Sequence, residues 1–233
     1  MSAKIAILVV VLGLGLMGAV AAEIVTRGPT ACDGVALTFD LCPVRDPPGF
    51  DRPLVGLLIE QQIPATFFVS GRWATRHDAE LKELLAVPFF EIGTHGQVHA
   101  HLPTLDDEQQ RREIEAAVTL LRDRFGRPTT LFRPPYGEYD ERTVSVVATL
   151  GLRFILWNLV SGDPDPQLSE EAIATFVQER MRRGSVVVFH ANGKGRYTKA
   201  VIEDLAPVLA ARGWQPMTVS TLLDRCHDGD RSH

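Results

Sequence analysis

Short runs of almost wholly apolar residues recur along the chain, separated by stretches with the residue spacing of helices. Strands that are apolar at every position are buried on both faces, which is typical of a parallel sheet or barrel covered by helices. We expect strands at Val35–Phe39, Ala65–Val69, Phe89–Ile92, Thr129–Phe132, Leu152–Trp157, Ser185–Phe189 and Gln215–Val219. This pattern predicts an α/β fold of about seven strand and helix units, a distorted and incomplete (β/α) barrel.

Residues that commonly begin or end helices divide the chain in the same way. Thr104 and Asp107 form a capping-box pattern before a helix that we expect to end near Gly126. Three more glycines follow predicted helices, at Gly151, Gly184 and Gly213. Because no fixed-period repeat and no low-complexity linker interrupts the pattern, we expect one domain over residues 23–233.

The first 22 residues differ from the rest. Lys4 precedes an uncharged apolar run over residues 5–20, and small residues, Ala21 and Ala22, follow it. This is the pattern of a cleaved signal peptide at residues 1–22. The alternative is an uncleaved anchor that tethers the domain to a membrane through residues 5–22. Both readings predict an exported protein, either periplasmic or secreted.

Charge and cysteine content narrow the class of protein further. The formal net charge is −5 at pH 7, so the chain lacks the strong positive field that would hold nucleic acid. The three cysteines are compatible with an oxidising compartment. We expect Cys32 to pair with Cys226, because both fall at the end of the fold opposite the carboxyl ends of the strands. Cys42 would then be the free thiol.

Five polar residues follow predicted strands, near the point where each strand ends: Asp40, His95, Arg133, Asp163 and His190. In parallel α/β folds these strand ends form the face where catalytic loops meet. Residues that are far apart in the sequence would therefore converge on one cleft. The sequence predicts an active site there.

The residue types suggest the chemistry of this cleft. His95 and His99 lie four residues apart and could bind one metal ion if the segment turns helically, and His101 is a further candidate. Asp40 leaves an apolar strand and has the character of a general base, which Arg133 could orient. His190 enters a glycine-containing loop and suits a general acid. Each residue could instead have a structural role, as a loop cap, a salt bridge or a surface histidine.

Together these segments resemble the ordered motifs of carbohydrate esterase family 4, the polysaccharide deacetylases with a NodB-like domain. The resemblance covers about residues 35–223, and its first motif has the atypical form TFDLCP. The segments that carry it are Thr38-Phe39-Asp40, His95-x-x-x-His99, Arg133-Pro134-Pro135-Tyr136, Trp157 with Asp163, and Val188-Phe189-His190.

The resemblance implies a distorted barrel that removes N- or O-linked acetyl groups from a polysaccharide, using a divalent metal that is often zinc. It makes Asp40 the base, and His95 and His99 metal ligands. The backbone N–H of Tyr136 would help bind the oxyanion, and His190 would protonate the leaving group.

Two positions depart from the family pattern. The third metal ligand of the family is an aspartate directly after the base, and here that residue is Leu41, which cannot bind metal. Cys42, Asp46 or a water could take its place. The family also tends to place an aspartate that partners the catalytic histidine where this chain has Val160, so Asp163 or a water would have to support His190.

These departures leave two alternatives beside the deacetylase. A domain that has lost the full metal triad could bind a glycan without catalysis. Related barrels also hydrolyse amides of small molecules, for which a deep, closed pocket would be expected.

Overall fold

The structure is a computed structural model that describes residues 22–44 and 49–228, with side chains through Arg225. The predicted signal peptide and tether lie almost wholly outside these residues, as does Asp46, so the predictions for them are untested. No helix within the described ranges is both long and apolar enough to cross a membrane.

Strands and helices alternate along the chain, as the apolar runs predicted. The strands are β1 (Ile24–Val25), β2 (Gly34–Leu41), β3 (Ala65–Val69), β4 (Phe90–Thr94), β5 (Leu131–Phe132), β6 (Arg153–Ile155), β7 (Leu159–Val160), β8 (Val186–His190) and β9 (Gln215–Met217). The α-helices are α1 (Arg52–Glu60), α2 (Gly71–Arg76), α3 (Asp78–Leu85), α4 (Asp107–Phe125), α5 (Glu141–Thr149), α6 (Glu170–Arg180), α7 (Thr198–Ala211) and α8 (Val219–Asp228). Two 3₁₀ turns are η1 (Leu102–Thr104) and η2 (Pro135–Gly137).

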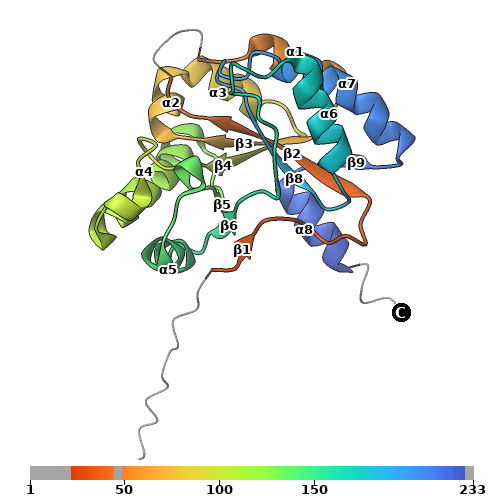
Figure 1. The fold of residues 1–233 in the computed structure, drawn as a ribbon. Helices are drawn as coiled ribbons and strands as arrows, with labels where there is room; N and C mark the ends of the chain where they lie inside the picture. The colour runs from red at the N-terminus through yellow and green to blue at the C-terminus, as the bar shows by residue number, and fades with distance from the viewer. Residues whose placement is uncertain (1–21, 45–48, 229–233) are drawn as a thin grey trace, which may run out of the picture.

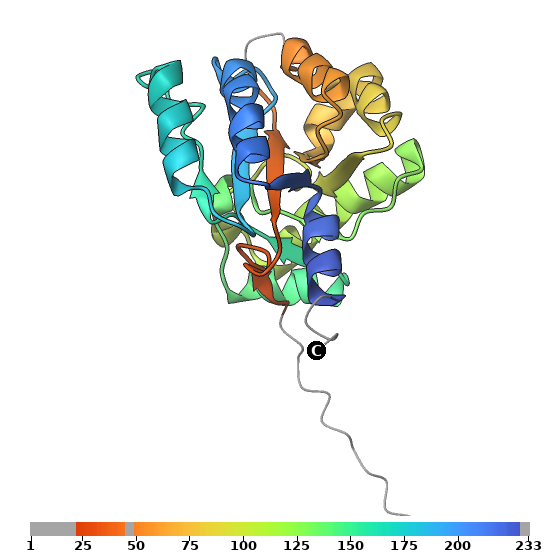
Figure 2. The same ribbon diagram turned by 90° about the vertical axis from the view of Figure 1, so that its right-hand side faces the viewer.

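The strands form one parallel sheet of nine strands in the order β1-β6-β5-β4-β3-β2-β8-β7, with β9 paired to the beginning of β2. The curled sheet is surrounded by helices, with α6 beside α7 and α4 beside α5 (Figure 1). Figure 2 shows α8 at the same end of the molecule as β1. The predicted distorted (β/α) barrel in one domain is confirmed.

Several details of the secondary structure differ from the prediction. The predicted strands Leu152–Trp157 and Gln215–Val219 end at Ile155 and Met217, and Val219 begins α8. β1 and β7, of two residues each, were not predicted. β5 is equally short, but it ends the longer β-favouring run Thr129–Phe132 that the sequence analysis identified. The capping box of α4 lies at Asp106 and Gln109, not at Thr104 and Asp107. Thr104 belongs instead to η1, and its hydroxyl donates a hydrogen bond to the carbonyl of His101.

The core explains why the strands show no alternation. On the face of the sheet that packs against α1 and α7, the ring of Phe39 stacks between those of Phe67 and Phe189, with centroids 5.4 and 5.7 Å away. The other face buries Phe68 and Ile155 against side chains of α8. All eight residues of β2 are buried, so an apolar side chain is favoured on both faces.

Candidate active site

The register of the sheet brings the predicted residues to one edge. Asp40 of β2 pairs with His190 of β8 on one side and with Phe68 of β3 on the other. The backbone N–H of Arg133 donates to the carbonyl of Thr94, so Arg133 and His95 leave neighbouring strands together. The convergence predicted from the strand ends is therefore what the structure shows.

Asp40 and Arg133 form a buried ion pair. The Nη1 of Arg133 donates to Oδ1 of Asp40 over 2.8 Å, and the guanidinium lies 4.0 Å from the centroid of the Phe68 ring. Burial by itself would raise the pKa of Asp40, but the charge and hydrogen bond of Arg133, with smaller effects of His95 and His190, lower it. Asp40 is thus held as a carboxylate with a fixed orientation.

The two histidines of the HxxxH segment lie side by side, although the segment is not helical. Their ring centroids are 4.8 Å apart, because Gly96 and His99 have positive φ values of 71° and 67°. Nδ1 of His95 is 2.8 Å from the carbonyl oxygen of Arg133 and can donate to it, which leaves Nε2 as an electron-pair donor. Burial, helped by the charge of His95, lowers the pKa of His99 to about 3, so its imidazole is neutral at ordinary pH.

Glu113, which sequence reasoning missed, shapes this loop. Its carboxylate on α4 accepts hydrogen bonds from the backbone N–H groups of Val98 and Ala100, at 2.7 and 3.3 Å. Glu113 is buried on the face of α4 that also buries Ile114 and Leu121. A charged residue at a position on the apolar face of a helix is the signal that could have identified it.

His190 has a carboxylate partner. Oδ1 of Asp163 lies 2.9 Å from Nδ1 of His190, and Oδ2 accepts the backbone N–H of the same residue over 2.8 Å. The hydroxyls of Ser161 and Thr198 also donate to Asp163 and keep it in place. Burial would lower the pKa of His190, but the hydrogen bond and charge of Asp163 raise it. Asp163 therefore occupies the role left open by Val160, which is exposed on β7.

Tyr136 lies on η2 next to the histidines. Its φ of 61° and ψ of 0° are left-handed, and the centroid of its ring is 4.4 Å from that of His99. The prolines Pro134 and Pro135 before it and the hydrogen bond from the N–H of Gly137 to the carbonyl of Pro134 make this turn tight.

The residues fit only part of the metal site that the family resemblance implies. His95 and His99 offer two neutral nitrogen donors, but Leu41 is buried in the apolar core. The thiol of Cys42 is buried beside the side-chain amide of Asn192, with Nδ2 and Sγ 3.0 Å apart, and burial raises its pKa. Among the residues that the structure describes, no three His, Cys, Asp or Glu side chains are grouped so that they could hold a metal ion.

The predicted disulfide is supported in part. Cys32 is disulfide-bonded and Cys42 is free, as expected. The side chain of Cys226 lies outside the described residues, so its pairing with Cys32 stays a prediction.

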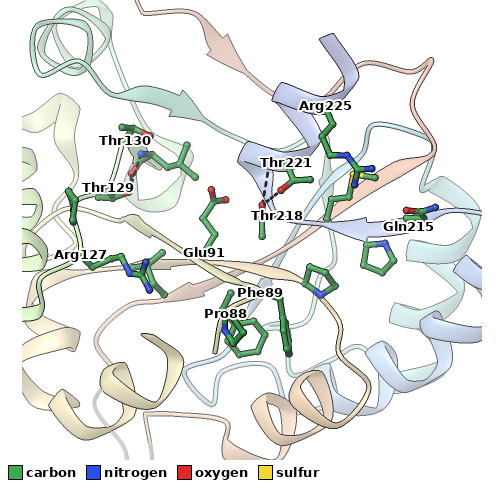
Figure 3. A pocket seen from close by; sticks show the side chains of 17 residues that line it. Pro88, Phe89, Glu91, Arg127, Thr129, Thr130, Gln215, Thr218, Thr221 and Arg225 are labelled. Carbon is green, nitrogen blue, oxygen red and sulfur yellow. Dashed lines mark hydrogen bonds between the residues drawn. The ribbon is translucent and has the colours of Figure 1, made fainter. Parts of the chain in front are cut away.

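A cavity of about 590 Å³ opens at the opposite end of the strands. Figure 3 shows Glu91 pointing into it, with Arg127 and Arg225 on opposite walls. None of the predicted site residues lines this cavity.

A family model described as polysaccharide deacetylase matches residues 27–155, more than half of the chain. The chain belongs to the polysaccharide deacetylase family. The family resemblance read from the sequence is thus confirmed, while the motif details and the roles of individual residues stay predictions.

Similar proteins include a named deacetylase and a named carbohydrate esterase. A chitin deacetylase of Pestalotiopsis sp is 28% identical over 203 residues, which cover 83% of this chain and 66% of that protein. The family 4 carbohydrate esterase from Streptomyces lividans, solved with acetate, is 29% identical, with a TM-score of 0.70 over 78% of this chain and 90% of that one.

The same fold also occurs in a protein described as a family 4 pseudoenzyme, from Bacillus anthracis. It has a TM-score of 0.77 at 19% identity, over 88% of this chain and 70% of that one. The chain spans between 27% and 66% of the length of the curated relatives that it matches first.

Proposed function

We propose that this protein is a hydrolase that removes N- or O-linked acetyl groups from a cell-envelope or extracellular polysaccharide. One observation carries the proposal: Asp40, held as a carboxylate, and His190, hydrogen-bonded to Asp163, occupy paired positions near the carboxyl ends of β2 and β8. A carboxylate that can accept a proton therefore faces the same edge as an imidazole that can donate one. Chitin deacetylases and carbohydrate esterases among the relatives support the substrate class.

Each side chain has a separate part in this reaction. Asp40, oriented by Arg133, takes a proton from the attacking water, and the backbone N–H of Tyr136 donates a hydrogen bond to the oxyanion. His190 gives its proton to the leaving amine or alcohol. The raised pKa of His190 favours this role, because the imidazole must be protonated before the leaving group departs.

The family resemblance adds a divalent metal ion, most simply zinc, to this proposal. His95 and His99 would hold it, and when bound it would acidify water and add positive charge near the oxyanion. Two protein nitrogens bind zinc more weakly than three protein ligands. We therefore expect the metal to be removed readily by a chelator.

The incomplete set of metal ligands favours a second candidate function, glycan binding without catalysis. Leu41 stands where the family has a ligand, and the described residues contain no three-ligand group. A domain with this incomplete ligand set could bind a glycan without hydrolysing it.

The test is acetate release from acetylated chitin oligomers, xylan and peptidoglycan by the full chain, with and without added zinc. We expect release by the wild type and none by Asp40→Asn, which should keep its metal. His95→Ala should lose both the metal and the activity. Glycan binding without acetate release, at any zinc concentration, would favour the binding function.

A further inference from the structure

The backbone of Tyr136 is held in a conformation that it would rarely adopt alone. A residue with a Cβ atom and a φ of 61° is strained, and such strain persists only where the surroundings enforce it. The Tyr136 side chain is largely exposed, so the protein contacts that hold it come from few neighbours. The strained residue carries the N–H that the proposed reaction needs.

His101 makes the closer of two ring contacts with Tyr136. Its ring lies parallel to the ring of Tyr136, with 4.1 Å between centroids and 2° between planes. The ring of His99 meets the same tyrosine edge-on. Tyr136 is thereby packed against two imidazoles of the histidine loop.

The orientation of His101 is set by Glu138. Oε2 of Glu138 lies 2.7 Å from Nδ1 of His101, and Glu138 is only two residues beyond Tyr136. The carbonyl of His101 accepts hydrogen bonds from both the backbone N–H and the hydroxyl of Thr104. Glu138 therefore contacts His101, and His101 contacts Tyr136. These two contacts connect the η2 segment to the loop before η1.

We propose that His101 and Glu138 are positioning residues that hold Tyr136 in its left-handed conformation, with its N–H directed at the reacting carbonyl. The proposal rests on the proposed hydrolase function. It also gives His101 a role other than that of a third metal ligand, because among the described residues His101 does not join His95 and His99 in a three-ligand group.

The kinetic test compares His101→Ala with His101→Phe, which keeps a flat ring for stacking. We expect His101→Ala to lower kcat roughly tenfold, less than the roughly 10²–10³-fold loss that follows removal of an oxyanion donor, because the N–H is displaced and not removed. KM and zinc content should stay unchanged. His101→Phe should recover most of kcat. Val98→Ala is the matched control, because Val98 is an exposed side chain of the same loop, and it should keep the wild-type rate.

Glu138 is tested in the same assay. Glu138→Gln retains an oxygen that can accept from His101 and should stay near the wild-type kcat. Glu138→Ala should have a kcat close to that of His101→Phe, because both variants keep a ring against Tyr136 and lose the hydrogen bond between residues 101 and 138. Equal loss in His101→Ala and His101→Phe would overturn the stacking role. A rise in KM without loss of kcat would make His101 a sugar contact, and loss of zinc would make it a ligand, so either result also overturns the proposal.

A spectroscopic measurement tests whether His101 holds Tyr136 in place, independently of whether the protein is a hydrolase. The chain has three tyrosines, so ¹⁵N-tyrosine labelling gives a simple amide spectrum in which Tyr136 can be assigned. Its amide resonance should move in His101→Ala and return towards the wild-type position in His101→Phe. If the wild type releases no acetate, these shifts still test whether His101 positions Tyr136. A Tyr136 amide resonance that does not move in His101→Ala would overturn the proposal.

Discussion

At the scale of single residues, the partner of His190 decides the pH range of the proposed reaction. Asp163 raises the pKa of His190 against the opposite effect of burial. The general acid acts while protonated, so activity should fall as pH rises through this pKa. In Asp163→Asn the pKa should drop, and the alkaline limb of the rate profile should move to lower pH with a smaller kcat.

The pH profile of acetate release measures this shift. Ser161→Ala is the control, because it removes one hydrogen bond to Asp163 but keeps the carboxylate, so its alkaline limb should move less. If the alkaline limb of the rate profile of Asp163→Asn stays at the wild-type pH, His190 is not the titrating acid.

The buried pair of Asp40 and Arg133 is a second prediction at this scale. Both side chains are buried, and removing one partner leaves a buried charge without compensation. We expect Arg133→Met to lower the free energy of unfolding by about 3–5 kcal/mol. Urea denaturation measures it.

A double variant isolates the charge effect in that pair. Adding Asp40→Asn to Arg133→Met should restore part of the lost stability, since no buried carboxylate then remains. Additive losses would show that packing of the guanidinium on Phe68 and Trp157, rather than the charge pair, provides the stability.

At the scale of elements, the beginning of α5 gives a prediction about acid stability. Asp140 caps α5 through the backbone N–H of Thr143 and pairs with Arg142. Burial would raise the pKa of Asp140, but these hydrogen bonds lower it to about 2. The negative charge of Asp140 therefore stabilises the folded state at pH values above 3.8, the ordinary pKa of aspartate. This stabilisation is lost as the pH falls towards about 2.

Asp140→Asn tests this because asparagine also caps helices. At pH 7 the variant should be less stable than the wild type by about 0.5 kcal/mol, as for a partly exposed ion pair. The difference should shrink between pH 4 and about pH 2 in thermal unfolding. A difference that is constant across this range would mean that the charge contributes nothing.

At the scale of the whole molecule, the disulfide of Cys32 constrains the segment just before β2. A bond to Cys226, the predicted partner, would close most of the chain into one loop and reduce the entropy of the unfolded state. We expect Cys32→Ser to lower stability by about 2–4 kcal/mol. Thermal unfolding with and without a reductant measures it, and reductant should affect the wild type but not the variant.

The sequence alone determined the class of fold and the location of the site. Continuous apolar runs can be satisfied only by burial on both faces, so a parallel sheet under helices followed from local pattern. Polar residues directly after those runs had to meet at one edge of the sheet. Asp40, His95, Arg133 and His190 were found in this way, because their position depends on the strand that precedes each of them.

Tertiary structure alone decided how these residues are supported. It selected Asp163, which the sequence offered as one possible support, as the hydrogen-bond partner of His190. Glu113 organises the histidine loop from α4, and His101 stacks on Tyr136. These pairs are 15 to 35 residues apart and have no shared periodicity, so no local pattern fixes their contacts. β1 and β7 were likewise not predicted, because their two residues lie outside the longer apolar runs and are strands through their pairing with β6 and β8.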